Sequence, residues 1–407
     1  MLTRLVARDF RNFEQLDVAV PPNGLVIIGE NGHGKTNLLE AAAYLSLLRS
    51  MRGARDVDMI RFGTPALHVR AELSPASAVQ QVSVGYERAT KRKKATLDGV
   101  EQARLTNALG AVPSVGFSPA DVALVAGSPG ERRRYLDVAL ALSSPTYLVA
   151  LQQFRGALLR RNAVLRLVHR DASLARSSAH AEQVSLWEPV LAEQGAMVTA
   201  MRVQFVAGHA ERFAQLARAI GERQPVTMRY VPTSVSTDRT ERARGERGGG
   251  ERGSGERGGS ERSDDQEQSL TDLRLRYATL YTQALAQQRS TELRRGATLV
   301  GPHRDDLGLL LGGRELRTFG SAGQQRSAAI ALRLLELATL RASLGRTPLL
   351  LMDDPFAELD LGRASRVLAL LGDAGVEQVL LAVPRVEDIP AEFTRLARAT
   401  MHDGVLT

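Results

Sequence analysis

Residues 29–41 read GENGHGKTNLLEA and contain the pattern GxxxxGK[ST] in full. The apolar run Leu25–Ile28 precedes them, and the segment that follows has apolar residues at helical spacing. Glycines in such a loop let backbone N–H groups turn toward phosphates, and the helix N-terminus adds a positive dipole. The sequence therefore predicts a nucleotide-binding loop made of Gly29, Glu30, Asn31, Gly32, His33, Gly34, Lys35 and Thr36.

Two side chains of this loop have defined chemical roles. Lys35 is expected to reach the β- and γ-phosphates and to act in catalysis, and the Thr36 hydroxyl is expected to bind Mg²⁺. A second acidic element should complete the metal site. The run LLLMDD at 349–354 is an apolar strand that ends in two carboxylates. We assign Asp353 to Mg²⁺, and Asp354 to the attacking water as a catalytic residue.

The separation of these two motifs indicates the class of ATPase. Lys35 and Asp353 lie 318 residues apart, much farther than in compact GTPases and kinase-like P-loop proteins. A long insertion between the motifs is typical of the ATP-binding cassette arrangement, in which a Ser/Gly signature contacts the ATP of a partner subunit. FGSAGQQ at 319–325 fits that signature at a predicted helix N-terminus. The residues expected at this interface are Ser321, Gly323 and Gln324 of the signature and Asp360 of a D-loop in FAELD.

Periodicity along the chain indicates an α/β fold: an ABC-type P-loop ATPase head with an inserted, mainly helical second lobe. Strands are predicted in residues 1–30, 66–100, 297–319 and 348–352, with a final strand at 377–383; helices are predicted in 36–50, 130–219, 270–294, 322–345 and 362–373.

The predicted domains follow from this order of elements. Residues 1–137 and 297–407 form the ATPase lobe, and residues 138–296 form the helical lobe. Within the second lobe, residues 236–269 repeat Glu-Arg every five residues among Gly and Ser and contain almost no apolar side chain. We interpret this segment as a disordered insert, because it cannot offset its ordering entropy by burial.

Composition restricts the class of protein further. The chain has 407 residues, 43% of them hydrophobic and 24% charged, which are ordinary values for a globular protein. It contains no cysteine, which excludes disulfides and thiolate metal sites and favours a cytoplasmic location. No apolar run approaches the ~18 residues that span a bilayer. Charged residues interrupt the N-terminal apolar residues, so a signal peptide is not expected there.

The charge distribution favours a polyanionic partner, and DNA is the partner we expect. The net charge is +8, and only four lysines stand among 53 basic residues. Aromatic residues make up 4% and are not interleaved with the basic runs, so contacts to the DNA backbone are expected rather than base stacking. The alternatives are a solvated basic hairpin at 90–94 and structural salt bridges at 132–134. The DNA candidates are Lys91, Arg92, Lys93, Lys94, Arg132 and Arg133.

Seven segments together resemble the RecF family of SMC-like ATPases. They are FRNF at 10–13, GENGHGKTNLLEA at 29–41, VGFSPADVALVAGSPGERRRYLD at 115–137, RRNAVL at 160–165, GPHRDDL at 301–307, SAGQQR at 321–326 and MDDPFAELD at 352–360. The resemblance implies an ATP-sandwiched homodimer on gapped or duplex DNA, with weak DNA-stimulated hydrolysis of ATP to ADP and phosphate. It also implies a role in DNA repair, recombination, replication and the SOS response, in which RecO and RecR help to load RecA.

Some positions depart from the pattern of that family. Ala322 follows the signature Ser where the family usually has Gln, and Ala357 replaces a Ser before Glu-Leu-Asp. LLAVPR at 380–385 contains no switch residue that would sense the γ-phosphate, so a non-catalytic ATP-gated DNA scaffold and another SMC-like ATPase are alternatives. His303 and Arg304 of GPHRDD are expected near the nucleotide or the lobe interface; the alternative is an ion pair of Arg304 with Asp305 or Asp306.

Overall fold

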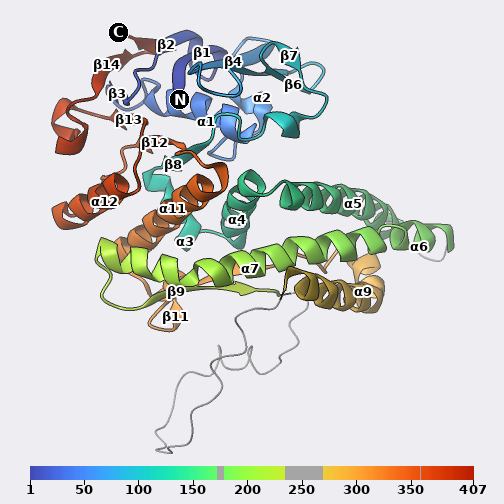
Figure 1. Cartoon of the computed structure of the whole chain (residues 1–407). Coiled ribbons are helices and arrows are strands. Elements are labelled where there is room, and N and C mark those ends of the chain that lie inside the picture. The colour runs from blue at the N-terminus through green and yellow to red at the C-terminus, as the bar shows by residue number, and fades with distance from the viewer. Residues whose placement is uncertain (172–177, 234–268, 358) are drawn as a thin grey trace, which may run out of the picture. The chain divides into compact units, whose positions relative to one another are not determined.

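The computed structural model describes residues 1–171, 178–233, 269–357 and 359–407, so most of the predicted insert at 236–269 lies outside the described residues (Figure 1). The chain divides into two compact units. Unit 1 comprises Met1–Gly127, Arg212–Val226 and Leu310–Thr407, and unit 2 comprises Ser128–Glu211 and Thr227–Leu309. Residues 128–137 and 297–309, predicted in the ATPase lobe, thus belong to unit 2, where Arg132 of the first segment binds Asp306 of the second.

An antiparallel sheet of unit 1 contains the N-terminal strands. Its order is β2-β1-β4-β5-β6-β7, and it confirms the strands predicted before residue 20 and at 66–100. The β6–β7 turn contains Asp98 and Gly99 with φ of 49° and 81°, which is the left-handed geometry of a tight hairpin. The strands are β1 (Leu2–Phe10), β2 (Phe13–Ala19), β4 (Ala66–Leu73), β5 (Gln81–Glu87), β6 (Arg92–Leu97) and β7 (Val100–Glu101).

The second sheet of unit 1 places both predicted nucleotide motifs at one edge. Its order is β15-β14-β3-β13-β12-β8, and strands β14, β3, β13, β12 and β8 run parallel. The carboxyl ends of β3 and β12 therefore lie on either side of the end of β13. The strands are β3 (Gly24–Ile28), β8 (Ser114–Phe117), β12 (Leu349–Asp353), β13 (Val379–Val383), β14 (Ala397–His402) and β15 (Val405–Leu406).

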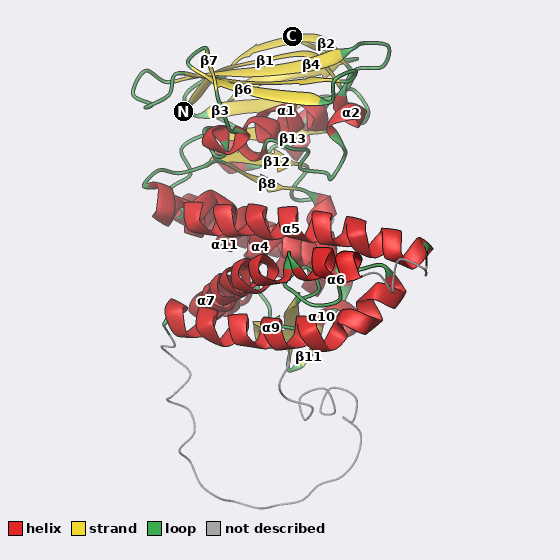
Figure 2. Cartoon of the chain, turned by 90° about the vertical axis from the view of Figure 1, so that its right-hand side faces the viewer, coloured by secondary structure: helices red, strands yellow, loops and turns green. Residues whose placement is uncertain are grey.

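Helix α1 (Lys35–Leu47) packs between the two sheets, as Figure 2 shows. Ten of its 13 residues are buried, which explains why it is rich in Leu and Ala on all sides and not only on one face. Around it, unit 1 contains α2 (Asp56–Met59), η1 (Leu105–Ala108), η2 (Pro119–Val122), α3 (Ala123–Ala126), α10 (Leu316–Phe319), α11 (Ala322–Leu344), α12 (Leu361–Asp373), η4 (Val386–Asp388) and η5 (Ala391–Phe393).

Unit 2 is mainly helical, as predicted for residues 130–219 and 270–294 (Figure 1). Its apolar core includes Phe154, Leu191, Tyr281 and Leu285. Helix α7 and the sheet β11-β10-β9 contribute residues to both units. The elements within unit 2 are α4 (Pro129–Ser143), α5 (Pro145–Arg170), α6 (Ser178–Ser185) and α9 (Leu270–Arg295). Those with residues in both units are α7 (Glu188–Ile220), β9 (Val226–Val231) and β10 (Asp306–Leu311), whereas β11 (Arg314–Glu315) lies in unit 1.

Two parts of the predicted secondary structure are wrong. The strand at 377–383 is not the last one, because β14 and β15 follow it. Of the segment 297–319, only residues 306–311 and 314–315 are strands; residues 316–319 are helical, and side chains from other elements hold much of 297–305 by hydrogen bonds. No helix in the described part of the chain is long and apolar enough to cross a membrane.

Candidate functional site

The predicted nucleotide-binding loop connects β3 to α1. Gly32 and Gly34 have φ of 91° and 112°, values that L-residues rarely adopt. A Cβ on Gly34 would also lie 2.7 Å from the side-chain nitrogen of Asn12. The two glycines therefore let the loop turn tightly into the N-terminus of α1, where backbone N–H groups have no partner within the helix.

Lys35 is the first residue of α1, and only 6% of it is exposed. Its Nζ donates hydrogen bonds to the carbonyl oxygens of Gly29 and Glu30, the latter at 2.8 Å. Burial lowers the pKa of this amine, while the carboxylates of Asp353 and Asp354 oppose that shift. The loop thus holds a partly desolvated cation against its own backbone, a position from which the amine can turn to a phosphate oxygen.

Thr36 and Asp353 meet although they are 317 residues apart. The Thr36 Oγ1 donates to the Asp353 Oδ2 at 2.8 Å. Burial raises the pKa of the Asp353 carboxyl, and the bond from Thr36 and the charge of Lys35 work against this shift. A hydroxyl and a carboxylate are hard oxygen donors of the kind that Mg²⁺ takes beside triphosphates, so this pair fits that ion.

A pocket opens at this edge of the parallel sheet. Asp354 lies in it with φ of 44°, a left-handed conformation that is rare for residues other than Gly, Asn and Asp. The phosphate loop and the acidic strand end on the same cavity, as the motifs predicted. Its lining consists of Asn31, Gly32, Gly34, Lys35, Thr36, Asn37, Arg52, Asp353, Asp354 and Pro384.

Arg52 lines this pocket and was missed by the sequence analysis. Its guanidinium donates to the Asn37 side-chain oxygen at 2.7 Å and to the buried carboxylate of Glu40. Burial raises the pKa of Glu40, but hydrogen bonds from Arg52, Arg11 and Ser50 outweigh it and hold that pKa below its usual value. Arg52 belongs to no motif, and its position follows from a charge partner, Glu40, on the preceding helix α1.

The signature residues form the N-terminal cap of α11. The Ser321 hydroxyl accepts from the Gln324 amide at 3.3 Å, and the Gln324 side chain accepts from the Ser321 amide at 2.9 Å. This capping box places the signature at a helix N-terminus, as predicted. A Cβ on Gly323 would lie 2.5 Å from a guanidinium nitrogen of Arg363, so a glycine leaves room for that side chain.

Asp360 caps the next helix, α12, and is connected to the same arginine. Its carboxylate accepts from the Arg363 amide at 2.8 Å and lies 3.6 Å from the Arg363 Nε. The other end of that guanidinium pairs with the nearly buried Glu222 at 3.2 Å. Arg363 therefore lies against both the signature and the predicted D-loop acid, a role that no sequence pattern indicated.

The basic run 90–94 contains residues of two kinds. Lys93 is 13% exposed at its side chain and pairs with Asp56 at 2.7 Å, and its amine lies 5.2 Å from the centre of the Tyr44 ring. Burial lowers its pKa, and Asp56 opposes that shift. Lys94 and Arg92 are exposed and share Glu101, at 2.8 and 3.4 Å. Lys93 is therefore used within unit 1, and we withdraw it as a DNA candidate.

Arg132 and Arg133 are also used inside the protein. Arg132, at the start of α4, donates two hydrogen bonds of 2.8 Å to the carboxylate of Asp306. Arg133 donates to the Asp305 carbonyl at 2.8 Å. Arg132 therefore forms the structural salt bridge that the sequence left as an alternative, and Arg133 binds a backbone carbonyl instead; we withdraw both arginines as DNA candidates.

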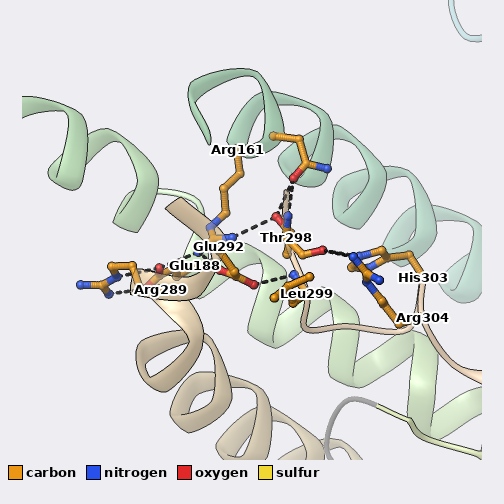
Figure 3. A network of polar contacts seen from close by, with 9 residues as sticks. Arg161, Glu188, Arg289, Glu292, Thr298, Leu299, His303 and Arg304 are labelled. Carbon is orange, nitrogen blue, oxygen red and sulfur yellow. Dashed lines mark hydrogen bonds and ion pairs between the residues drawn. The ribbon is translucent and has the colours of Figure 1, made fainter. Parts of the chain in front are cut away.

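The GPHRDD segment lies in a polar network of unit 2, part of which Figure 3 shows. His303 and Arg304 both contact the carbonyl oxygen of Thr298, each at 3.2 Å. The ion pair of Arg304 with either following aspartate, which the sequence left as an alternative, is not found in the described part of the chain: Asp306 binds Arg132, and the Asp305 carboxylate accepts from the Tyr230 hydroxyl at 2.8 Å. These motif residues therefore hold a loop in place within unit 2.

Arg161 of the RRNAVL segment anchors the other end of that loop (Figure 3). It is fully buried, and it donates to Thr298 Oγ1 at 2.9 Å, to Glu292 at 2.7 Å and to Glu188 at 3.0 Å. The second Glu292 oxygen accepts from the Leu299 amide at 2.6 Å. The charged residues of these two motifs therefore serve packing within unit 2, because Arg161 is paired with Glu188 and Glu292, and His303 and Arg304 contact a nearby carbonyl oxygen.

The phosphate loop, acidic strand and signature helix of unit 1 define an ATPase head of the ATP-binding cassette class. A family model described as RecF/RecN/SMC N terminal domain matches residues 1–406. A "DNA replication and repair protein RecF" of Rhodococcus erythropolis is 35% identical over 401 residues, which cover 96% of this chain and 91% of the relative. A protein of the same name from Streptomyces avermitilis is 32% identical over 416 residues, which cover 100% and 99%. The chain belongs to the RecF family of SMC-like ATPases.

Solved structures agree with this fold. A structure described as the recombination mediator protein RecF-ATPrS in the RecFOR pathway has a TM-score of 0.80 at 24% identity and covers 100% of this chain and 97% of its own. An Smc head domain from Pyrococcus furiosus has a TM-score of 0.51 at 14% identity, with 100% and 95% covered. These likenesses show an ABC-type head with an added helical unit.

Proposed function

We propose that this chain is an ATP-dependent DNA-binding protein of recombinational repair and replication maintenance in the cytoplasm. The observation that supports it most directly is the bond between Thr36 and Asp353 beside Lys35, which brings the residues proposed for the triphosphate and Mg²⁺ together from opposite ends of the chain. The name that the curated relatives share, DNA replication and repair protein RecF, supports the cellular role.

In this proposal each residue of the pocket has one task. Backbone N–H groups of the loop bind the phosphates, and Lys35 leaves its carbonyl partners for the β- and γ-phosphates. Thr36 and Asp353 hold Mg²⁺, which neutralises phosphate charge when it is bound. Asp354, at the end of the acidic strand, orients the attacking water and accepts its proton.

The second contact to the nucleotide comes from another copy of the chain. Ser321, Gly323 and Gln324 lie at the N-terminus of the 23-residue helix α11, whose dipole favours a γ-phosphate, and Asp360 lies beside them through Arg363. We propose that ATP is held between the loop of one copy and the signature of its partner. Binding then favours a homodimer on gapped or duplex DNA, and hydrolysis releases it.

DNA contacts in this proposal come from the exposed part of the basic run. Lys91, Arg92 and Lys94 lie on or next to strand β6 and its turn, and they remain candidates for backbone contacts. By family resemblance, the dimer acts with RecO and RecR to help load RecA.

A non-catalytic, ATP-gated DNA scaffold is the second candidate function. It is favoured by the end of β13, where the buried Val383 and then Pro384 stand and offer no side-chain hydrogen bond to a γ-phosphate. The two candidates share every binding step and differ only in turnover of ATP.

The test is sedimentation of the chain with Mg²⁺ and ATP, on gapped and on blunt duplex DNA, together with phosphate release. We expect ATP to produce a dimer, and Asp354→Asn to lower turnover by about 100-fold or more while it prolongs the ATP-bound dimer. Equal ATP turnover in Asp354→Asn and in the wild type would contradict the role of Asp354 in orienting the attacking water. An ATP-dependent dimer with no phosphate release in the wild type would establish the scaffold, and no dimer with ATP would contradict both candidates.

A further inference from the structure

His33, in the middle of the nucleotide-binding loop, contacts the C-terminal hairpin. Its neighbours Gly32 and Gly34 line the pocket, but His33 does not. The His33 carbonyl accepts from the Gly404 amide at 2.9 Å, and its Nδ1 accepts from the Asp403 amide at 2.9 Å. The β14–β15 turn therefore packs on the loop and fixes the position of one imidazole.

Three donor groups converge at this point. Asp403 Oδ1 lies 3.2 Å from His33 Nδ1, and Asp403 Oδ2 lies 3.6 Å from His402 Nδ1. The two imidazole rings have centroids 4.7 Å apart. One donor atom from each of the three residues lies within 4.8 Å of the other two. Among the described residues, no other set of three His, Asp or Glu side chains brings its donor atoms this close.

We propose that His33, His402 and Asp403 bind a divalent transition metal of the Zn²⁺ type. Two imidazoles and a carboxylate form one of the ligand sets of three-residue zinc sites, in which a water completes a tetrahedron. The chain has no cysteine, so a borderline-soft metal finds its best ligands in its seven histidines. The site differs from the Thr36–Asp353 pair, whose two oxygens suit Mg²⁺.

The geometry requires little rearrangement. The side chain of His33 is 18% exposed and held in place, whereas those of His402 and Asp403 are 77% exposed and can change rotamer. The hydrogen bond from the Asp403 amide to His33 Nδ1 is replaced by a coordination bond if that nitrogen binds the metal. The bound metal would fasten the C-terminal hairpin to the nucleotide-binding loop. This last effect rests on the proposed ATP site, but metal binding itself does not.

The test uses the untagged full chain, stripped of metal and free of nucleotide because triphosphates bind Zn²⁺ themselves. Zn²⁺ is titrated in competition with a chromophoric chelator, and Co²⁺ reports coordination by its visible absorption. We expect one site in the wild type, weakened by about tenfold or more in His402→Ala and in Asp403→Asn. Asn tolerates the φ of 46° at position 403, so this variant keeps the turn while it removes the charge.

The matched control is His169→Ala, which removes an exposed imidazole of helix α5 and should leave the Zn²⁺ affinity unchanged. Thermal unfolding in chelator establishes that the variants are folded. Equal Zn²⁺ affinity in wild type, His402→Ala and Asp403→Asn would overturn the proposal, as would Co²⁺ spectra that do not differ among them. Failure of the proposed ATP site is a separate result, because it would appear as wild-type protein that does not bind ATP in Mg²⁺ buffer.

Discussion

The nucleotide pocket of unit 1 and the GPHRDD network of unit 2 both consist of charged motif residues, yet they differ in how those charges are satisfied. In the pocket, Lys35 is held by carbonyl oxygens of its own loop, and the cavity in front of it is open. In the network, Arg161 and Glu292 are fully buried and bind each other. A charge that can exchange its partner can bind a ligand, whereas a buried and paired charge supports the fold.

The pKa shifts follow the same division. In the pocket, burial moves Lys35 and Asp353 toward their neutral forms, which a polyanion and a cation would reverse on binding. In the network, Arg202 is fully buried between Asp137, Tyr147 and Tyr230, and the aspartate charge and the hydrogen bonds to the tyrosine hydroxyls raise its pKa well above the usual value in spite of burial. That arginine stays charged and cannot serve as a proton donor or acceptor.

The largest effect is expected from Arg161→Ala, because it leaves Glu292 buried without its cation. The free energy of unfolding of unit 2 should fall by about 3 to 5 kcal/mol. The single tryptophan, Trp187, lies in unit 2, so urea unfolding followed by its fluorescence reports on this unit. Arg166→Ala on the same helix, where the arginine is exposed, is the control and should cost less than about 1 kcal/mol. Equal losses in the two variants would contradict the assignment of Arg161 to the fold.

Lys35→Met tests the opposite side of the comparison. It should lower the affinity for ATP by about 100-fold or more, because a charge-assisted bond to the phosphates is lost. The free energy of unfolding should change by less than about 1 kcal/mol, since a partly desolvated amine is replaced by an apolar chain. Nucleotide titration and urea unfolding on the same protein measure both quantities. Unchanged ATP affinity would refute the assignment of Lys35 to phosphate binding. A large loss of stability would show that Lys35, like Arg161, supports the fold.

Local patterns were sufficient to predict that the glycine-rich loop and the acidic strand end lie at one pocket. The glycines, Lys35 and Thr36 are consecutive, and Asp353 ends an apolar strand, so each half was recognisable by itself. The parallel sheet then brings the halves together at its carboxyl edge. The order of strands and helices likewise gave the α/β class and the helical insertion. Strand β14 was missed because its sequence, ARATMH, has only one buried side chain.

The ion-pair partner of a charged side chain could not be predicted, because it can lie on a segment far away in the chain. The sequence left Arg132 between a DNA contact and a structural salt bridge, and the contact with Asp306, 174 residues away, favours the salt bridge. Lys93 is likewise neutralised by Asp56 on another element. A sequence shows that a residue is charged, and only the fold shows whether that charge is already paired with another group of the protein.

A smaller effect is expected in the pH dependence of the free energy of unfolding, to which Asp305 of the network contributes. Burial raises the pKa of Asp305 to about 6, against a usual value of 3.8, while Tyr230 and Arg202 oppose the shift. Because the folded state binds this proton more tightly, its contribution to stability is fully present below the unfolded pKa and is lost as the pH rises through 6. Asp305→Asn cannot titrate, and its amide oxygen can still accept from Tyr230.

The stability of the wild type relative to Asp305→Asn should therefore fall between pH 4.5 and 7.5, by at most about 3 kcal/mol. Urea unfolding at several pH values measures it. His303, whose pKa burial lowers to about 4, has the opposite pH dependence, but it is present in both proteins and cancels in the difference. Parallel stability curves for the two proteins would show that Asp305 is ionised at little cost in the folded state.

The smallest effect is expected from Lys93 and Lys94, two neighbouring lysines on strand β6. Lys93 is largely buried and paired, whereas Lys94 is exposed. Lys94→Gln removes an exposed charge and leaves Glu101 paired with Arg92, so DNA affinity should fall modestly. The slope of log affinity against log salt should decrease by about 0.9 for one lost phosphate contact. Lys93→Met should leave that slope unchanged and lower the stability of unit 1 instead, because Asp56 loses its buried partner. If Lys93→Met changes the slope of log affinity against log salt and Lys94→Gln does not, then the burial of a lysine in this run does not tell whether it binds DNA or supports the fold.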